Sequence, residues 1–168
     1  MNNFKFYNPT KILFGEGSIK DIAGEIPRGT KILMTYGGGS IKRNGVFDEV
    51  KKVLQGYELE EFGGIEPNPT YETLMQCVEI VRKNKTDFLL AVGGGSVIDG
   101  TKFIAAAVLY EGEPWDIVKT YGKKVKSVLP FGTVLTLPAT GSEMNNGAVI
   151  THRSSQTKLP FAHPLLFP

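Results

Sequence analysis

The sequence predicts an α/β fold in which a mostly parallel sheet has helices on both faces. Apolar runs of a strand's length, bounded by Gly, Pro or Asp, alternate with segments of helical periodicity. Two of these runs end in the same string, GGGS, at Gly37–Ser40 and Gly93–Ser96. Because strands that alternate with helices need crossover connections, they form a parallel sheet with both faces covered.

The expected strands are short apolar runs that end at turn-forming residues. Two runs near the N-terminus, Phe4–Tyr7 and Lys11–Phe14, are joined around Asn8-Pro9, which predicts a hairpin at an edge of the sheet. The other expected strands are Lys31–Tyr36, Tyr57–Phe62, Asp87–Val92, Gly132–Leu137 and Gly147–Thr151.

Two segments between these runs have the pattern of amphipathic helices. The segment from Pro69 to Lys85 has apolar residues at i, i+3, i+4 and i+7, counted from Leu74, which gives it one apolar face. We expect Asn68 and Pro69 to supply its cap and its first-turn proline. The segment Val46–Leu54 predicts a second helix.

Length and composition exclude several classes of protein. A chain of 168 residues, 41% hydrophobic and 21% charged, suits one soluble domain. No apolar run approaches the roughly 20 residues of a membrane span, and the first residues lack the order of a signal peptide. Cys77 is the only cysteine, which excludes a disulfide framework and a cysteine-rich zinc site. We expect a cytoplasmic protein.

The charge of the chain gives no support for a nucleic-acid partner. The formal net charge is +2. The densest basic run, GKKVKS at Gly122–Ser127, has one neighbouring aromatic residue, Tyr121, and is expected to be a solvated loop.

The glycine turns suit an anion at the start of a helix. The first backbone N–H groups of a helix have no intrahelical partner, and glycine lets the backbone approach a ligand closely. Ser96 adds a hydroxyl group, Asp99 complements the helix dipole, and Lys102 lies on the same helix face as Asp99. The string GGGSVIDGTK therefore predicts a phosphate or diphosphate site, with a tight turn that binds nothing as the alternative.

Residue spacing alone supports a nucleotide-binding α/β domain and nothing finer. The pattern G-x-G-x-x-G fails at its third glycine in both copies, where Lys42 and Ile98 stand, and no Walker GK[ST] follows. The acidic patch Glu58, Glu60 and Glu61 either contains a ribose-binding acid or is a solvated strand end.

A hydrolase and a histidine metal site both lack support. Neither Ser96 nor Ser142 lies in a G-x-S-x-G motif. The two histidines, His152 and His163, belong to no metal-binding or catalytic pattern and are interpreted as ordinary loop residues.

Several motifs in order carry a family resemblance. They are FYNPTKILFGEGSI at the start, EPNPTYETL at 66–74, GGGSVIDGTK at 93–102 and LTLPATGSEMN at 135–145. Together they resemble the iron-containing (group III) alcohol dehydrogenase family, and within it the branch of NADPH-dependent aldehyde reductases and butanol dehydrogenases. The resemblance implies a Rossmann-like, N-terminal dinucleotide-binding domain, a helical C-terminal domain and an active site in the cleft between them.

The resemblance also implies roles for individual residues. Asp99 matches a residue that lines the cofactor and substrate cleft, which makes it the one candidate catalytic residue. The residues matched to cofactor contacts are Gly94, Gly95, Ser96 and Asp99 at the diphosphate turn and cleft, Gly37, Gly38 and Ser40 facing the adenine ribose, Asn68 and Lys158 reaching the cofactor, and Thr136, Leu137, Thr140 and Asn145 flanking adenosine and the nicotinamide ribose.

One departure from the family pattern bears on cofactor choice. NAD-preferring relatives place an acid where Gly38 stands, and a carboxylate there would repel a 2′-phosphate. Gly38 leaves space, Ser40 offers a hydrogen bond, and Lys42 and Arg43 add positive charge, so we expect NADP(H) over NAD(H). A second departure, Pro138-Ala139, leaves open which backbone groups contact nicotinamide.

The family's metal ligands, one Asp and three His, all match positions beyond Pro168, so no metal ligand is assigned here. We therefore expect residues 1–168 to be a dinucleotide-binding domain that stops before its last strand, lacks the helical domain and is inactive alone. The full-length protein is expected to be a homodimer that uses NADP(H) and divalent iron or zinc on small aldehydes or alcohols. The alternatives are an NAD-kinase-like phosphotransferase and a non-catalytic nucleotide-binding module.

Overall fold

The first strand of the sheet sends alternate side chains to opposite faces, and a separate core forms on each face. The computed structural model describes residues 3–168. On strand β1 (Lys31–Tyr36), Leu33 packs into the core on one face, while Ile32 and Met34 pack into the core on the other. The two cores confirm the expected sheet with helices on both faces.

Four parallel strands form the main sheet, in the order β2-β1-β3-β4. The sequence predicted all four, with small differences at their ends. Besides β1 they are β2 (Glu58–Phe62), β3 (Phe88–Gly94) and β4 (Phe131–Leu137).

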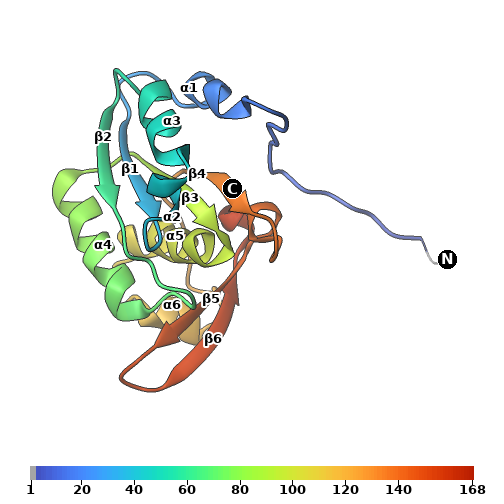
Figure 1. Ribbon diagram of the computed structural model, residues 1–168. Helices are drawn as coiled ribbons and strands as arrows, with labels where there is room; N and C mark the ends of the chain where they lie inside the picture. Colours follow the sequence, from blue (N-terminus) through green and yellow to red (C-terminus); the bar gives the residue numbers. More distant parts are fainter. Residues whose placement is uncertain (1–2) are drawn as a thin grey trace.

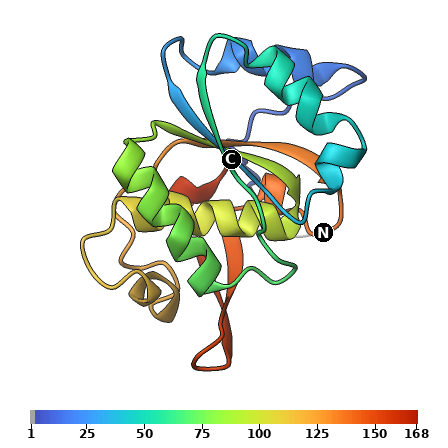
Figure 2. The same cartoon turned by 60° about the vertical axis from the view of Figure 1, so that its left-hand side comes forward.

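The helices divide between the two faces of the sheet (Figures 1 and 2). One core contains residues of α4 (Tyr71–Asn84), α5 (Gly95–Val108) and α6 (Trp115–Lys119). The other contains residues of α2 (Ser40–Arg43) and α3 (Val46–Val53), and α1 (Ile22–Glu25) packs against it. The described residues also form three short 3₁₀ helices, η1 (Ser18–Asp21), η2 (Ser142–Met144) and η3 (Pro164–Leu166).

The fifth expected strand does not join the parallel sheet. Strand β5 (Gly147–His152) instead pairs with β6 (Thr157–Ala162) in an antiparallel hairpin. The sequence did not indicate β6, because Pro160 lies in its middle, and proline lacks a backbone donor. A two-stranded hairpin has two edges, which tolerate proline, and α5 packs against β5 in place of a sheet neighbour.

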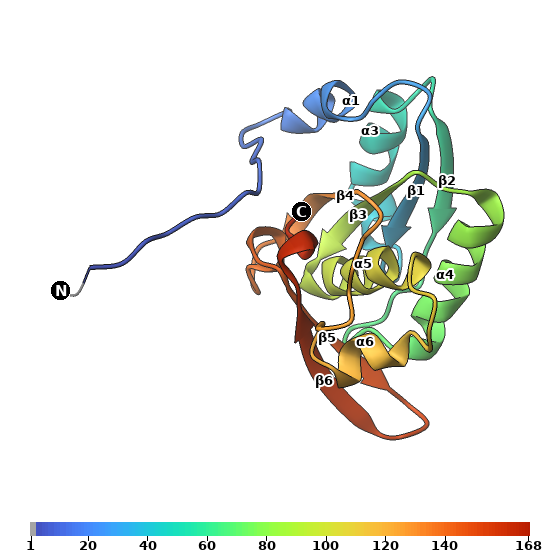
Figure 3. The ribbon, with the colours of Figure 1, turned by 180° about the vertical axis from the view of Figure 1, so that it is seen from behind.

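The prediction of an N-terminal edge hairpin was wrong. Residues 3–14 form no strand, and the N-terminal part of this segment runs away from the rest of the domain (Figures 1 and 3), while Asn8 Nδ2 donates a hydrogen bond to the Met144 carbonyl at 2.6 Å. The apolar side chains of this segment, such as Phe6 and Phe14, are exposed. Two short strands without a packed face are marginal in water, and within the described residues no sheet edge lies along this segment to pair with it.

The start of α4 also differs from the prediction. Thr70 is the N-cap, and its side chain accepts a hydrogen bond from the backbone N–H of Thr73. Asn68, the expected cap, lies two residues earlier with a left-handed φ of 58°. The basic run Gly122–Ser127 is a loop with exposed lysines, as expected. Among residues 3–168, no helix is long and apolar enough to cross a bilayer.

Candidate functional site

The two GGGS turns lie beside each other at the carboxyl edge of the sheet. Gly37–Ser40 follows β1, Gly93–Ser96 follows β3, and these strands are neighbours. The chain goes from β1 to β2 on one side, while β3 lies on the other side, so the strand order reverses here. Open α/β sheets bind their ligands in the crevice at such a switch point.

Val97 packs between the two turns. A Cβ atom added at Gly93 would lie 2.7 Å from Val97 Cγ2, and one added at Gly37 would lie 3.6 Å from the same atom. Val97 is buried, so its side chain fills space that the glycines leave free. The packing of Val97 therefore gives a structural reason for glycine at position 93, besides any ligand.

Helix α5 starts directly at the second turn. Gly94 is its N-cap, and no side chain of the described residues caps the helix, so the first N–H groups keep their partial positive charge. A Cβ atom added at Gly95 would overlap the side chain of Thr140. Gly95 thus allows the loop after β4 to approach the helix end, and Thr140 forms one wall of the turn.

Asn68 joins Ser96 to Lys158 beside this helix end. The backbone N–H of Asn68 donates a hydrogen bond to Ser96 Oγ at 3.4 Å, and Lys158 Nζ donates to Asn68 Oδ1 at 2.7 Å. The backbone N–H of Thr151 donates to the carbonyl of Pro69 at 2.9 Å. The β5–β6 hairpin therefore holds the loop before α4 against the second glycine turn.

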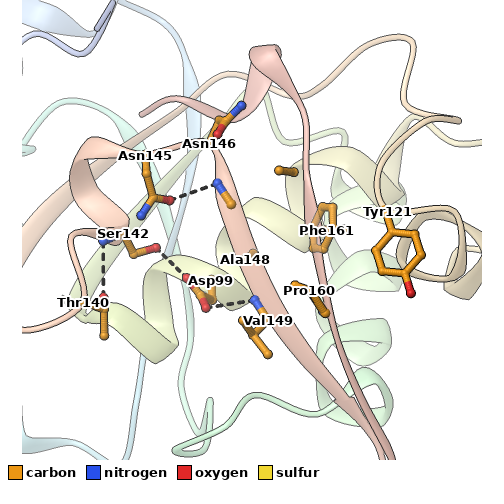
Figure 4. Close-up of a pocket in the computed structure, with 12 residues that line it drawn as sticks. Asp99, Tyr121, Thr140, Ser142, Asn145, Asn146, Ala148, Val149, Pro160 and Phe161 are labelled. Carbon is orange, nitrogen blue, oxygen red and sulfur yellow. Dashed lines mark hydrogen bonds between the residues drawn. The ribbon is translucent and has the colours of Figure 1, made fainter. Parts of the chain in front are cut away.

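Asp99 has hydrogen bonds to both of its carboxylate oxygens (Figure 4). Ser142 Oγ donates to Oδ1 at 2.5 Å, and the backbone N–H of Val149 donates to Oδ2 at 3.0 Å. Burial raises the pKa of Asp99, while the bonds from Ser142 and Val149 and the positive charge of Lys102 oppose this increase.

Lys102 reaches the same serine as Asp99, as expected for residues three apart on one helix. The sequence did not predict its full burial, with an exposed fraction of 0%. Burial lowers the pKa of Lys102 to about 8, although the negative charges of Asp99 and Glu143 favour the protonated form.

An open cavity of about 560 Å³ lies between the loop after β4 and the β5–β6 hairpin (Figure 4). Polar groups of Asp99, Ser142 and Asn145 line one side, and the hairpin supplies mainly apolar groups. The complete lining is Asp99, Tyr121, Thr140, Ser142, Asn145, Asn146, Gly147, Ala148, Val149, Pro160, Phe161 and Ala162.

The structure distributes the sequence-predicted site residues over three neighbouring places. Gly37, Gly38 and Ser40 follow β1; Asn68, Gly94, Gly95, Ser96 and Lys158 surround the start of α5; Thr136 and Leu137 end β4, and Asp99, Thr140 and Asn145 line the cavity.

Sequence analysis missed several residues of the cavity. Ser142, which bonds Asp99, lies within the motif LTLPATGSEMN and could have been found there. Tyr121, Val149 and Phe161 carry no motif and come together only through the tertiary structure.

The described residues do not provide a metal centre. In the range 3–168, no three His, Cys, Asp or Glu side chains come close enough to hold an ion. His152 ends β5 and stacks on Trp115 with ring centroids 4.7 Å apart, and His163 accepts a hydrogen bond from the backbone N–H of Leu165. Both histidines therefore make structural contacts.

Comparisons with known proteins place this geometry in a family. The family model of the iron-containing alcohol dehydrogenases matches residues 9–168. The NADPH-dependent aldehyde reductase YqhD of Escherichia coli K12 is 57% identical, over 96% of this chain and 42% of that protein. NADH-dependent butanol dehydrogenase B of Clostridium acetobutylicum is 46% identical, over 100% of this chain and 44% of that protein.

Solved structures give the same result. The crystal structure of E. coli K-12 YqhD has a TM-score of 0.96 at 55% identity, and covers 99% of this chain and 43% of YqhD. That of NADH-dependent butanol dehydrogenase A from Thermotoga maritima has a TM-score of 0.93 at 45% identity, over 100% of this chain and 43% of that protein. The chain thus spans less than half the length of these relatives, and it belongs to the iron-containing alcohol dehydrogenase family.

Proposed function

We propose that this chain forms the NADP(H)-binding part of an enzyme that transfers hydride between the cofactor and primary alcohols or aldehydes. The observation that carries the proposal is the pair of glycine turns at the switch point between β1 and β3, one of which opens an uncapped helix. The activities named for the two curated relatives, aldehyde reductase and butanol dehydrogenase, support the same reaction class.

The start of α5 is the proposed diphosphate site. Its unpaired N–H groups and the hydroxyl of Ser96 donate to phosphate oxygens, and Gly94 lets the backbone come close. Lys158 and Asn68, which already bond each other at 2.7 Å, supply a positive charge and an amide on the opposite wall.

The loop after β4 and the cavity are the proposed place of the reacting groups. Leu137, with an exposed fraction of 65%, offers an apolar surface at the end of β4. Thr140 and Asp99 both line the adjoining cavity, whose mainly apolar hairpin side offers a surface for the carbon chain of a small substrate. When bound, the nicotinamide ring supplies or accepts the hydride.

A divalent metal is implied by the family name, but the residues described here do not fit one, because they bring no three ligating side chains together. We therefore assign no step to a metal within residues 3–168. Because the described residues bring no metal ligands together, we expect residues 1–168 alone to bind the dinucleotide without catalysing turnover.

The choice of NADP(H) over NAD(H) rests on the first turn. Nothing lies within 4 Å of a Cβ atom added at Gly38, so the position has room for a 2′-phosphate. The positive charge of Lys42 is less available to a ligand than the sequence suggested, because its Nζ lies 3.6 Å from Glu61 Oε2 and over the ring of Phe47. Exposed Ser40 and Arg43 are then the remaining candidates for phosphate contacts.

Titration of the full-length protein with NADPH and with NADH, followed by nicotinamide fluorescence, tests the proposal. We expect saturable binding with a lower Kd for NADPH. Gly38→Asp should raise the Kd for NADPH at least tenfold and leave that for NADH similar or lower, because a carboxylate repels the 2′-phosphate. Gly38→Ala is the matched control. No binding of either cofactor would contradict the proposed function, and an unchanged ratio in Gly38→Asp would contradict the preference alone.

A further inference from the structure

One ammonium group holds together most of the loop that lines the cavity. Lys102 Nζ donates to the carbonyl oxygens of Ser142, Asn145 and Gly147 at 2.7, 2.7 and 2.9 Å. It also lies 3.2 Å from Ser142 Oγ and 3.0 Å from Asn145 Oδ1. Five acceptors of one six-residue loop therefore face a single, fully buried cation.

The direction of the hydrogen bonds continues from this cation to Asp99. The carboxylate of Asp99 can only accept, so the hydroxyl of Ser142 donates a hydrogen bond to Oδ1, and Ser142 Oγ accepts one from Lys102 Nζ. The order Lys102–Ser142–Asp99 is thus fixed. Because the backbone N–H of Val149 occupies Oδ2, the carboxylate of Asp99 is held at both oxygens.

The loop around Lys102 touches both parts of the proposed site. Thr140, just before it, packs against Gly95 at the start of α5. Ser142, Asn145 and Gly147 line the cavity together with Asp99. A shift of the loop would therefore move the wall of the diphosphate turn and the polar side of the cavity at once.

We propose that Lys102 is a positioning residue, whose ammonium group fixes the Ser142–Gly147 loop and, through Ser142, the Asp99 carboxylate. The inference rests on the proposed function, because the role of Lys102 is to hold the diphosphate turn and the cavity in fixed positions relative to each other. Lys102 itself is enclosed by the loop and touches neither ligand space.

Lys102→Met tests this role, with Thr101→Val as the matched control. Methionine keeps the apolar stem and removes every donor. Thr101 is the adjacent fully buried polar residue of α5, and its hydroxyl bonds Thr35 and the Val97 carbonyl, away from the loop. We expect Lys102→Met to raise the Kd for NADPH at least tenfold and to speed hydrogen exchange at the amides of Gly147 and Val149. Thr101→Val should change neither.

A second variant covers the case that Lys102→Met does not fold. Ser142→Ala breaks the connection to Asp99 and leaves the three carbonyl bonds intact, whereas Ser142→Thr keeps the hydroxyl. The side-chain carboxyl resonance of Asp99 gives its pKa directly, and the charged groups that act on it are Lys102 and Lys158. We expect Ser142→Ala to raise that pKa and Ser142→Thr to restore it, a pattern that simple destabilisation would not produce.

The outcomes separate the two proposals. If the unmodified protein fails to bind NADPH, the proposed function fails, while loop exchange and the pKa of Asp99 still report on Lys102. If the unmodified protein binds NADPH and Lys102→Met binds equally well with unchanged loop exchange, the positioning role is overturned. An unchanged pKa of Asp99 in Ser142→Ala overturns the step through Ser142.

Discussion

The same four residues, GGGS, build two different structures in this chain. At Gly37–Ser40, Gly39 is left-handed, with a φ of 89°, and caps a helix of four residues whose first residue is exposed. At Gly93–Ser96, the strand runs on to Gly94 in extended conformation, and Gly95 starts a helix of 14 residues that is buried over much of its length. The string GGGS thus permits a turn after a strand, and the residues packed around each copy determine the backbone conformation that it adopts.

The neighbours differ because side chains pack beside two glycines of the second turn, whereas the middle of the first turn is open. Val97 and Thr140 occupy the space beside Gly93 and Gly95, whereas nothing lies within 4 Å of a Cβ atom added at Gly38 or Gly39. On the proposed function, we infer that Gly38 in the first turn tolerates change and influences which cofactor binds, while the second turn sets the geometry of the site. The predictions below test this difference, from the largest expected effect to the smallest.

The largest effect concerns the buried lysine behind the second turn. The pKa of Lys102 is lowered from 10.5 to about 8 in the folded protein. The unfolded state therefore binds more protons between these pH values, and the stability contributed by this group rises with pH across the window. The free energy of unfolding of the unmodified protein, minus that of Lys102→Met, should increase by about 3 kcal/mol from pH 8 to pH 10.5.

Chemical denaturation at several pH values measures this difference. Other titrating groups cancel in the subtraction to the extent that the variant does not disturb them. Thr101→Val, which should follow the pH dependence of the unmodified protein, is the control. A flat difference curve would show that the folded protein does not depress this pKa.

The first glycine of each turn should differ next. A Cβ atom at Gly93 meets three atoms of Val97 within 3.4 Å, so Gly93→Ala should lower the free energy of unfolding by about 1–3 kcal/mol. Gly37→Ala should cost less, about 1 kcal/mol, because the atom nearest to its added Cβ is the Ile65 carbonyl oxygen at 3.2 Å. A double-mutant cycle with Val97→Ala checks the cause. If Gly93→Ala lowers the free energy of unfolding equally with and without Val97→Ala, a clash with Val97 is not the cause.

The third glycines should have similar costs for different reasons. Gly39→Ala forces a side chain into a left-handed backbone and should cost about 1 kcal/mol, with Gly39→Asn milder. Gly95→Ala collides with Thr140 more closely than Gly93→Ala does with Val97, but Thr140 is exposed and its side chain can turn aside, so the cost should also be about 1 kcal/mol. Thermal unfolding distinguishes them, since Thr140→Ala should recover stability only in Gly95→Ala. Recovery in Gly39→Ala as well would mean that the turns are not independent.

The smallest effect is expected at Gly38. The residue is exposed, its φ is not in the left-handed range, and no atom lies near an added Cβ, so Gly38→Ala should change stability by less than about 0.5 kcal/mol. Thermal unfolding at pH 7 measures this. A larger loss would show that the first turn is under packing constraint too.

Sequence patterns predicted those parts of the fold that depend on local physics. Helix α4 follows from the apolar spacing that starts at Leu74, and β1 follows from an apolar run that ends at Gly37. Patterns failed where a segment's partner decides its structure. Residues 4–14 have the apolar content of strands but no partner among the described residues, and β6 forms despite Pro160 because β5 lies beside it.

The candidate site divides in the same way. Motif spacing predicted an anion site at a helix start that includes Gly94 and Ser96, and the family resemblance added Asp99 as a residue of the cleft; these assignments stay predictions. Motif spacing did not show that Thr140 packs on Gly95, because those residues lie far apart in sequence.

The sequence by itself determined a parallel α/β domain with two glycine turns and the family to which it belongs, because periodicity and motifs are properties of neighbouring residues. Only the tertiary structure decided that the turns meet at one switch point and that β5 leaves the sheet for a hairpin. It also decided the environment of Lys102. A lysine side chain is ordinarily solvated, and this one is buried because the Ser142–Gly147 loop folds its carbonyl groups around the ammonium.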